Sequence, residues 1–138
     1  MQKIDAIIGP HSLERYAPMF MVMQGLLFII GCIYWIDAAH GSGSFHESTW
    51  GSFAYNLSAE FWAMLNMGAA TLTLIGLINP IHRKMVTIGG LLHCMQHVGL
   101  SASAFFTGGD LGVGLYASVF FLTMHMIMTA GAISEWTQ

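Results

Sequence analysis

Polar side chains recur along one side of an otherwise apolar stretch, residues 85–106. The stretch contains no Asp, Glu, Lys or Arg, and its polar members include His93, Gln96, His97 and Ser101. At ~100° per residue, this spacing places all four on one face of an α-helix. Polar groups within hydrocarbon are costly, and they normally face a bundle interior or a water-filled cavity. The stretch therefore predicts a membrane helix with one lipid-facing side and one protein-facing side.

The histidines could support three kinds of chemistry. A second apolar stretch carries His125, and counting ~1.5 Å per residue places His93 and His125 at one depth, ~4 Å to the cytoplasmic side of the bilayer centre. These two imidazoles could be axial ligands of haem b. Alternatively, His93 and His97, at positions i and i+4, could share one transition-metal ion. The same groups could also line a path for water or protons.

The simplest interpretation of these residues is structural. Gln24 and Asn66 fall near the same depth in two other apolar stretches, so all four stretches contribute to one polar layer that fixes helix register. The layer comprises Gln24, Asn66, His93, Gln96, His97 and His125. Packing needs no cofactor, so we expect none, with haem b or a transition metal as the alternative. A bound haem would need room between the helices, which Gly89, Gly90 and Gly114 could provide.

The composition indicates a membrane protein. Of 138 residues, 55% are hydrophobic and only 8% are charged, whereas soluble domains carry ~25% charged residues. The net charge of −3 comes from few charges without a basic patch, so nucleic acid is not an expected partner. Cys32 and Cys94 fit neither a CxxC motif nor a disulfide framework. Since no nucleophile–base pair, phosphate loop or dinucleotide fingerprint is present, we expect no enzymatic activity of the chain alone.

Four apolar stretches are long enough to cross a hydrocarbon core of ~30 Å as helices. They cover residues 18–36, 58–78, 85–106 and 111–133 of a single domain, 1–138. Pro18 can begin the first helix, because proline is tolerated at the first helical position. In the second stretch, a seam of small residues allows close helix contact; it consists of Ala59, Ala63, Asn66, Ala70 and Thr73. The sequence thus predicts an all-α, polytopic membrane protein with four transmembrane helices in an antiparallel bundle.

The basic residues predict the orientation of this bundle. Lys3 and Arg15 precede the first stretch, and Arg83 and Lys84 lie in the short connection between the second and third. Four spans would put all of these charges on one side of the membrane. Because Lys and Arg are enriched in cytoplasmic loops, we expect both termini in the cytoplasm, with the protein in a bacterial inner membrane.

The amino-terminal segment carries a family resemblance. Residues 4–18, IDAIIGPHSLERYAP, lead straight into four short spans, and this arrangement resembles small multi-span membrane proteins encoded by tailed bacteriophages of marine bacteria. The resemblance covers the amino-terminal third of the chain and implies a phage-encoded membrane protein that is holin-like or virion-associated. It assigns no functional residue.

The function expected from the sequence is that of a non-enzymatic integral membrane protein acting by helix packing and assembly. Its expected partners are the lipid bilayer and either further copies of itself or other membrane subunits. The alternative is a haem-carrying, metal-carrying or structural subunit of a larger membrane complex.

Overall fold

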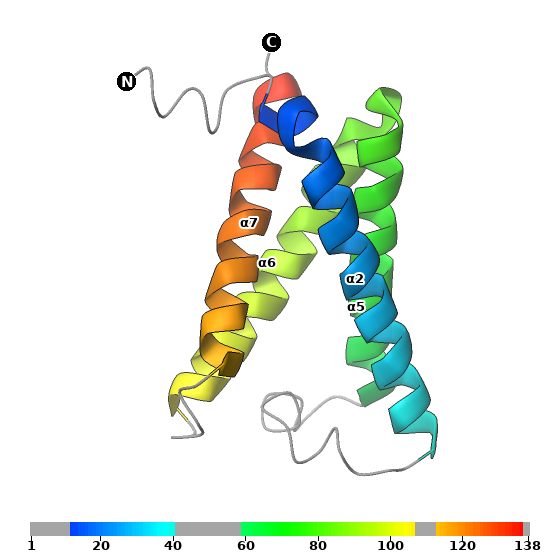
Figure 1. The fold of residues 1–138 in the computed structure, drawn as a ribbon, viewed down its shortest axis with the longest axis vertical. Helices are drawn as coiled ribbons and strands as arrows, with labels where there is room; N and C mark the ends of the chain where they lie inside the picture. The colour runs from blue at the N-terminus through cyan, green and yellow to red at the C-terminus, as the bar shows by residue number, and fades with distance from the viewer. Residues whose placement is uncertain (1–11, 41–58, 107–112, 137–138) are drawn as a thin grey trace.

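The computed structural model describes residues 12–40, 59–106 and 113–136. The long elements within these residues are all α-helices: α2 (Ser12–His40), α5 (Ala59–Ile78), α6 (Arg83–Phe106) and α7 (Val113–Trp136). A short 3-10 turn, η1 (Pro80–His82), joins α5 to α6. For the described residues, the all-α prediction is therefore confirmed, and each helix overlaps one of the four predicted stretches (Figure 1).

The first helix is longer than the sequence predicted. α2 begins at Ser12 and contains Pro18, so the proline lies within the helix and does not begin it. A proline in a helix interior removes one backbone hydrogen bond. The turn before it nevertheless carries Leu13, which is fully buried in the same apolar core as Phe20. Burial of Leu13 favours continuing the helix through the proline.

Three of the helices are long and apolar enough to cross a membrane. Within the described residues they are Leu13–Asp37, Glu60–Ile78 and Tyr116–Glu135. α6 is as long as α7 but is not among them, because its histidines, glutamine and glycines lower its mean hydropathy. The structure thus shows a helical protein with three candidate membrane spans, and the fourth predicted span needs a separate argument.

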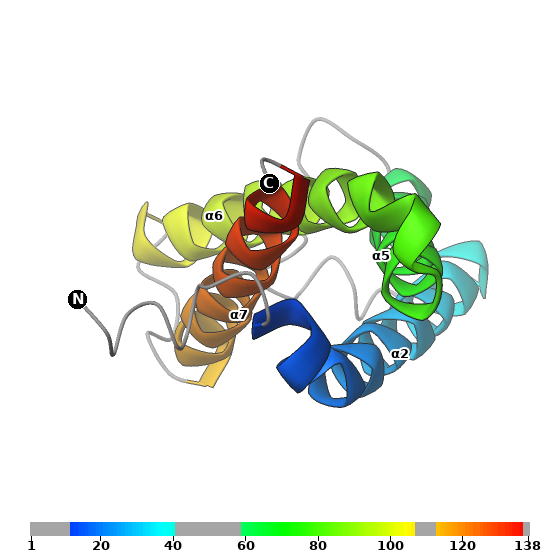
Figure 2. The same ribbon diagram turned by 90° about the horizontal axis from the view of Figure 1, so that it is seen from above.

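Successive helices run antiparallel and pack in chain order (Figure 1). α2 lies against α5, α5 against α6 and α6 against α7, whereas α2 touches α7 only over a short segment. Seen from above, that approach occurs at the end where α2 begins and α7 finishes (Figure 2). Toward the opposite end, the α2–α5 pair and the α6–α7 pair diverge (Figure 1). The bundle therefore consists of two helix pairs joined along α5 and α6.

A short polar turn sets α5 beside α6. The Asn79 Oδ1 atom accepts a hydrogen bond from the Ile81 backbone N–H at 3.1 Å, and the His82 N–H donates to the Asn79 carbonyl at 2.9 Å. Pro80 follows directly and cannot continue the preceding helix. These local bonds reverse the chain within a few residues, so consecutive helices become neighbours.

Glycines bring the helices of the bundle close together. A Cβ atom at Gly89 would overlap the Thr73 side chain of α5, and one at Gly90 would overlap Thr129 of α7. Close backbone approach at small residues is typical of membrane helices. The expectation that these glycines leave room for a bound ring is therefore wrong, because both are used for direct helix contact; the surroundings of Gly114 lie outside the described residues.

Candidate functional site

Each of the helices buries polar side chains at the centre of the bundle. Gln24 of α2, Asn66 of α5 and His125 of α7 are at most 5% exposed, as are three residues of α6: His93, Gln96 and His97. The structure therefore buries all six members of the predicted polar layer. We refer to His93, His97 and His125 as the histidine cluster.

The cluster forms where α6 packs against α7. The ring centroids of His93 and His125 are 4.4 Å apart, and those of His97 and His125 are 5.3 Å apart. His93 and His97, one turn apart on α6, have centroids separated by 6.2 Å. The predicted contact between His93 and His125 is thus present, and His97 joins it. On its other side, His97 stacks on Phe121 at 5.5 Å, a neighbour that sequence reasoning missed.

Hydrogen bonds define the protonation of His125. Its Nδ1 atom lies 2.7 Å from the backbone carbonyl of Phe121, which can only accept, so Nδ1 carries the proton. The Nε2 atom of the neutral ring is then an acceptor, and the Gln24 amide donates to it at 2.9 Å. This pair of bonds fixes the imidazole and connects α2 to α7 through the bundle interior.

The other two rings are incompletely bonded. The Nδ1 atom of His93 donates to Gln96 Oε1 at 3.1 Å, but His93 Nε2 has no hydrogen-bond partner in the protein. Neither ring nitrogen of His97 has one, and the remaining amide atoms, Gln24 Oε1 and Gln96 Nε2, also lack partners. Buried polar groups are normally paired, because each unpaired group costs between ~1 kcal/mol and several kcal/mol. The cluster therefore holds more hydrogen-bonding capacity than packing uses.

Asn66 serves a different helix pair. Its Nδ2 atom donates to the backbone carbonyl of Leu27 at 2.6 Å and so links α5 to α2. The predicted single polar layer is thereby divided: Asn66 secures the α2–α5 pair, whereas Gln24 of α2 bonds to His125 of α7 beside the histidines of α6. Depth alone could not reveal this division, because it depends on which helices are neighbours.

The arrangement does not fit a haem held between His93 and His125. Their centroids, 4.4 Å apart with ring planes at 36°, are at the separation of aromatic rings in direct contact. Two axial ligands would instead have a macrocycle between them. Gly90, which was expected to make space beside them, is filled by contact with Thr129. A haem at this position would require α6 and α7 to separate.

A metal ion shared by His93 and His97 remains a prediction. Transition metals bind imidazole nitrogens at ~2.0–2.1 Å and commonly take three or four protein ligands. Among the described residues, no group of three or more His, Cys, Asp or Glu side chains is placed to hold a metal ion. His93 and His97 would therefore have to bind such an ion as a pair or with reorientation of their rings.

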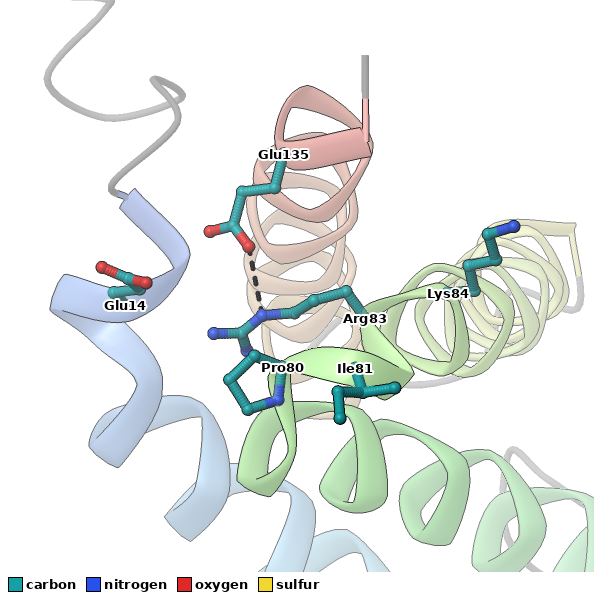
Figure 3. A pocket seen from close by; sticks show the side chains of 6 residues that line it. All are labelled: Glu14, Pro80, Ile81, Arg83, Lys84 and Glu135. Carbon is teal, nitrogen blue, oxygen red and sulfur yellow. Dashed lines mark ion pairs between the residues drawn. The ribbon is translucent and has the colours of Figure 1, made fainter. Parts of the chain in front are cut away.

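A second polar site lies where α6 begins and α7 ends (Figure 3). Arg83 Nε is 3.1 Å from Glu135 Oε2, and Arg83 Nη1 donates to the Gly76 carbonyl at 3.2 Å. A cavity of about 300 Å³ adjoins this ion pair; its lining residues are Glu14, Pro80, Ile81, Arg83, Lys84 and Glu135. The sequence pattern did not predict the ion pair between Arg83 and Glu135, although four spans would place both residues on the same side of the membrane.

Comparison of the chain with protein-family models, curated proteins and solved structures finds no match. Functional inference therefore rests on the geometry of these two sites and on the distribution of polar and apolar side chains over the helices.

Proposed function

We propose that α6 is the fourth membrane span and that the protein is a non-enzymatic integral membrane protein acting by helix packing and assembly. The observation that supports a fourth span is the sorting of side chains around α6. The outward side of α6 is apolar; Met95 is 71% exposed and Val98 53% exposed. Its imidazoles at His93 and His97 are at most 5% exposed. A helix lying in water would show the opposite pattern, so the low mean hydropathy of α6 fits a span that lines a polar interior.

The charges support an orientation with both termini in the cytoplasm of a bacterial cell. Arg15 lies in the first turns of α2, and Arg83 and Lys84 begin α6. Figure 1 places the start of α2, the start of α6 and the finish of α7 at the same end of the bundle. Basic residues gathered at one end favour that end as the cytoplasmic one.

Cysteine labelling tests this topology. In a Cys32→Ala, Cys94→Ala background, single cysteines are placed at Ser44 and at Gln138, and intact cells are treated with a membrane-impermeant maleimide. We expect labelling of Ser44→Cys alone. Labelling of Gln138→Cys alone would invert the orientation. Labelling of both would mean that an even number of spans, not three, lies between residues 44 and 138, and would contradict the fourth span.

The outer face of α5 is the surface that we propose for assembly. It exposes Met64, Gly68, Thr71 and Ile75, and a Cβ atom built at Gly68 would meet nothing within 4 Å. Small residues at helix surfaces let membrane helices approach closely, because packing rather than the hydrophobic effect drives their association. This face is therefore suited to a second copy of the chain.

Two matched glycines test the assembly surface. A Cβ atom at Gly25 of α2 would likewise meet nothing within 4 Å, so we expect Leu at either position to be accommodated by the monomer fold. We expect the purified protein in mild detergent to contain more than one copy by light scattering, Gly68→Leu to yield single copies, and Gly25→Leu to behave as the parent. Single copies of the parent chain, or equal effects of both variants, would contradict assembly through α5.

The resemblance of residues 4–18 supports a phage-encoded protein, in which assembly within the bilayer would serve a holin-like or virion-associated role. The alternative is a structural subunit of a larger membrane complex. Purification from the native host in mild detergent distinguishes them, because a subunit would retain other membrane chains in fixed stoichiometry, whereas a self-assembling protein would not.

A further inference from the structure

The interface between α6 and α7 keeps one register along its length. Arg83 pairs with Glu135, Gly90 lies against Thr129, and both His93 and His97 contact His125. Residues of rising number on α6 thus lie against residues of falling number on α7, as expected for antiparallel helices. Counting on in the same register, we expect Ser118 of α7 opposite Ser101 of α6, on the side of the histidine cluster remote from the ion pair.

Unpaired polar atoms occur at successive levels of this interface. Thr87 Oγ1 and Thr129 Oγ1 lie between the ion pair and the histidines, and Ser101 Oγ lies beyond them; all three are buried without a hydrogen-bond partner in the protein. His93 Nε2 and both nitrogens of His97 fill the middle. At ~1.5 Å per residue, the distance from Arg83 to Ser101 along α6 is ~27 Å, close to the ~30 Å thickness of the hydrocarbon core.

Packing alone does not account for this arrangement. A core that only fixed helix register would pair its polar groups, since each unpaired one is costly. Apart from the amide atoms of Gln24 and Gln96, the unpaired atoms at these levels belong to hydroxyl and imidazole groups, which both donate and accept protons. They line one interface and continue toward the cavity beside Arg83 and Glu135, where water has access.

We propose that the α6–α7 interface is a proton path across the membrane, with His93 and His97 as its relay groups. Hydroxyls of Thr87 and Thr129 lead from the ion-pair cavity to the relay, and Ser101 with Ser118 leads away from it. His125 is a positioning residue, because Phe121 and Gln24 occupy both of its ring nitrogens. The inference rests on the proposed crossing of the membrane by α6.

Each transfer conserves charge and protons. A proton reaching the lone pair of an imidazole nitrogen forms an imidazolium, and the N–H bond at the other nitrogen then breaks as its proton moves to the next lone pair or hydroxyl. One N–H bond has formed and one has broken, so the ring is neutral again in its other tautomer. Rotation of the ring about its Cβ–Cγ bond then changes where the N–H bond and the lone pair point, so that a lone pair again faces the incoming proton.

His97 provides the sharpest test, because none of its nitrogens is hydrogen-bonded to the protein. In His97→Phe, one flat ring replaces another against Phe121, so the fold is retained while the relay is interrupted. His93→Phe is a second variant, which removes the other relay group. His82→Phe is the control, since His82 is an exposed histidine in η1, outside the interface.

The measurement uses the full chain in liposomes of phosphatidylcholine and phosphatidylglycerol. Internal pyranine reports acidification while valinomycin and a potassium gradient set an inside-negative potential, and a parallel batch carries calcein. We expect protein-dependent acidification without calcein release, loss of that acidification in His97→Phe and His93→Phe, and full acidification in His82→Phe. Circular dichroism and the elution volume on size-exclusion chromatography in detergent check that each variant is folded.

Three results would overturn the proposal. They are acidification no faster than in protein-free liposomes, calcein release together with acidification, which would indicate an unselective holin-like lesion, and undiminished acidification in both folded relay variants. Cysteine labelling tests the crossing of α6 separately, so a four-span protein without proton flux contradicts the relay alone.

Discussion

The α2–α5 pair and the α6–α7 pair use the same antiparallel packing but differ in what they bury. Between α2 and α5, Gly31 lies against Met67, Cys32 Sγ approaches Met67 Sδ at 3.5 Å, and Asn66 donates to the Leu27 carbonyl. This interface is mostly apolar, and the amide nitrogen of Asn66 is paired. Between α6 and α7, the centre is occupied by the histidine cluster, whose nitrogens are only partly paired.

The two interfaces differ in what holds the helices together. Lipid provides no hydrophobic driving force between helices, so the apolar α2–α5 pair depends on shape and on the flexible Met67 side chain to fill its contacts. The α6–α7 pair carries unpaired polar atoms that packing would not require. The concentration of unpaired hydroxyl and imidazole atoms on α6 and α7 is the reason for proposing the relay at that interface.

The largest expected effect comes from overfilling the close contact between α6 and α7. In Gly90→Leu, the new side chain overlaps Thr129, and overpacking of this kind lowers the free energy of unfolding by about 3 kcal/mol or more. Unfolding by SDS titration measures it. A Cβ atom at Gly25 would meet no atom within 4 Å, so Gly25→Leu should change the value by less than about 0.5 kcal/mol; equal losses would show that the assigned contact is absent.

A smaller loss is expected from the bond that connects the two pairs. Gln24→Leu removes the donor to His125 Nε2, and interhelical bonds of this kind contribute about 0.6–1.7 kcal/mol. A double-mutant cycle with His125→Phe isolates the coupling between these side chains. Asn66→Leu should cost less, because the Leu27 carbonyl lies within α2 and keeps its helical partner. Independent effects of the Gln24 and His125 substitutions would refute the bond.

The ion pair at the end of the α6–α7 pair should contribute still less. Arg83 and Glu135 side chains are 12% and 17% exposed, and pairs near water contribute about 1 kcal/mol or less. Arg83→Gln should therefore lower the unfolding free energy slightly in dilute buffer. Added salt should reduce the difference between the parent and the variant. A difference that persists in high salt would point to the Gly76 carbonyl contact as the main interaction of Arg83.

The smallest effect on stability is expected from His97→Phe. No hydrogen bond is lost, and the apolar ring removes two unpaired nitrogens from the interior, so the unfolding free energy should stay within about 0.5 kcal/mol or rise. SDS titration of this variant beside the parent checks it. A clear loss would mean that His97 is bonded in the folded protein and would weaken its assignment as a relay group.

Much of this arrangement could be predicted from the sequence. The spacing of polar residues on residues 85–106 correctly placed His93 and His97 inward and Met95 outward, because helical periodicity is a local property. Depth counting correctly brought His93 to His125, because consecutive antiparallel helices joined by short turns share a register.

Other features depend on contacts that local patterns do not encode. Leu13 is buried against residues distant in sequence, so the extension of α2 through Pro18 was missed. Glycine spacing showed that helices come close, but not that Gly90 meets Thr129 rather than a ligand. The Arg83–Glu135 pair required knowledge of which helix ends adjoin.

The central claim is that α6 crosses the bilayer with its apolar side toward lipid. Spin labels at Met95 of α6, at Ile29 of α2 and at Ile81 of η1 test it in liposomes, because collisions with oxygen and with a water-soluble nickel complex report the surroundings of each label. All three positions are exposed at the protein surface. We expect the label at Met95, like that at Ile29, to collide with oxygen and to be shielded from nickel, while the label at Ile81 collides with nickel. A label at Met95 as accessible to nickel as that at Ile81 would contradict the fourth span.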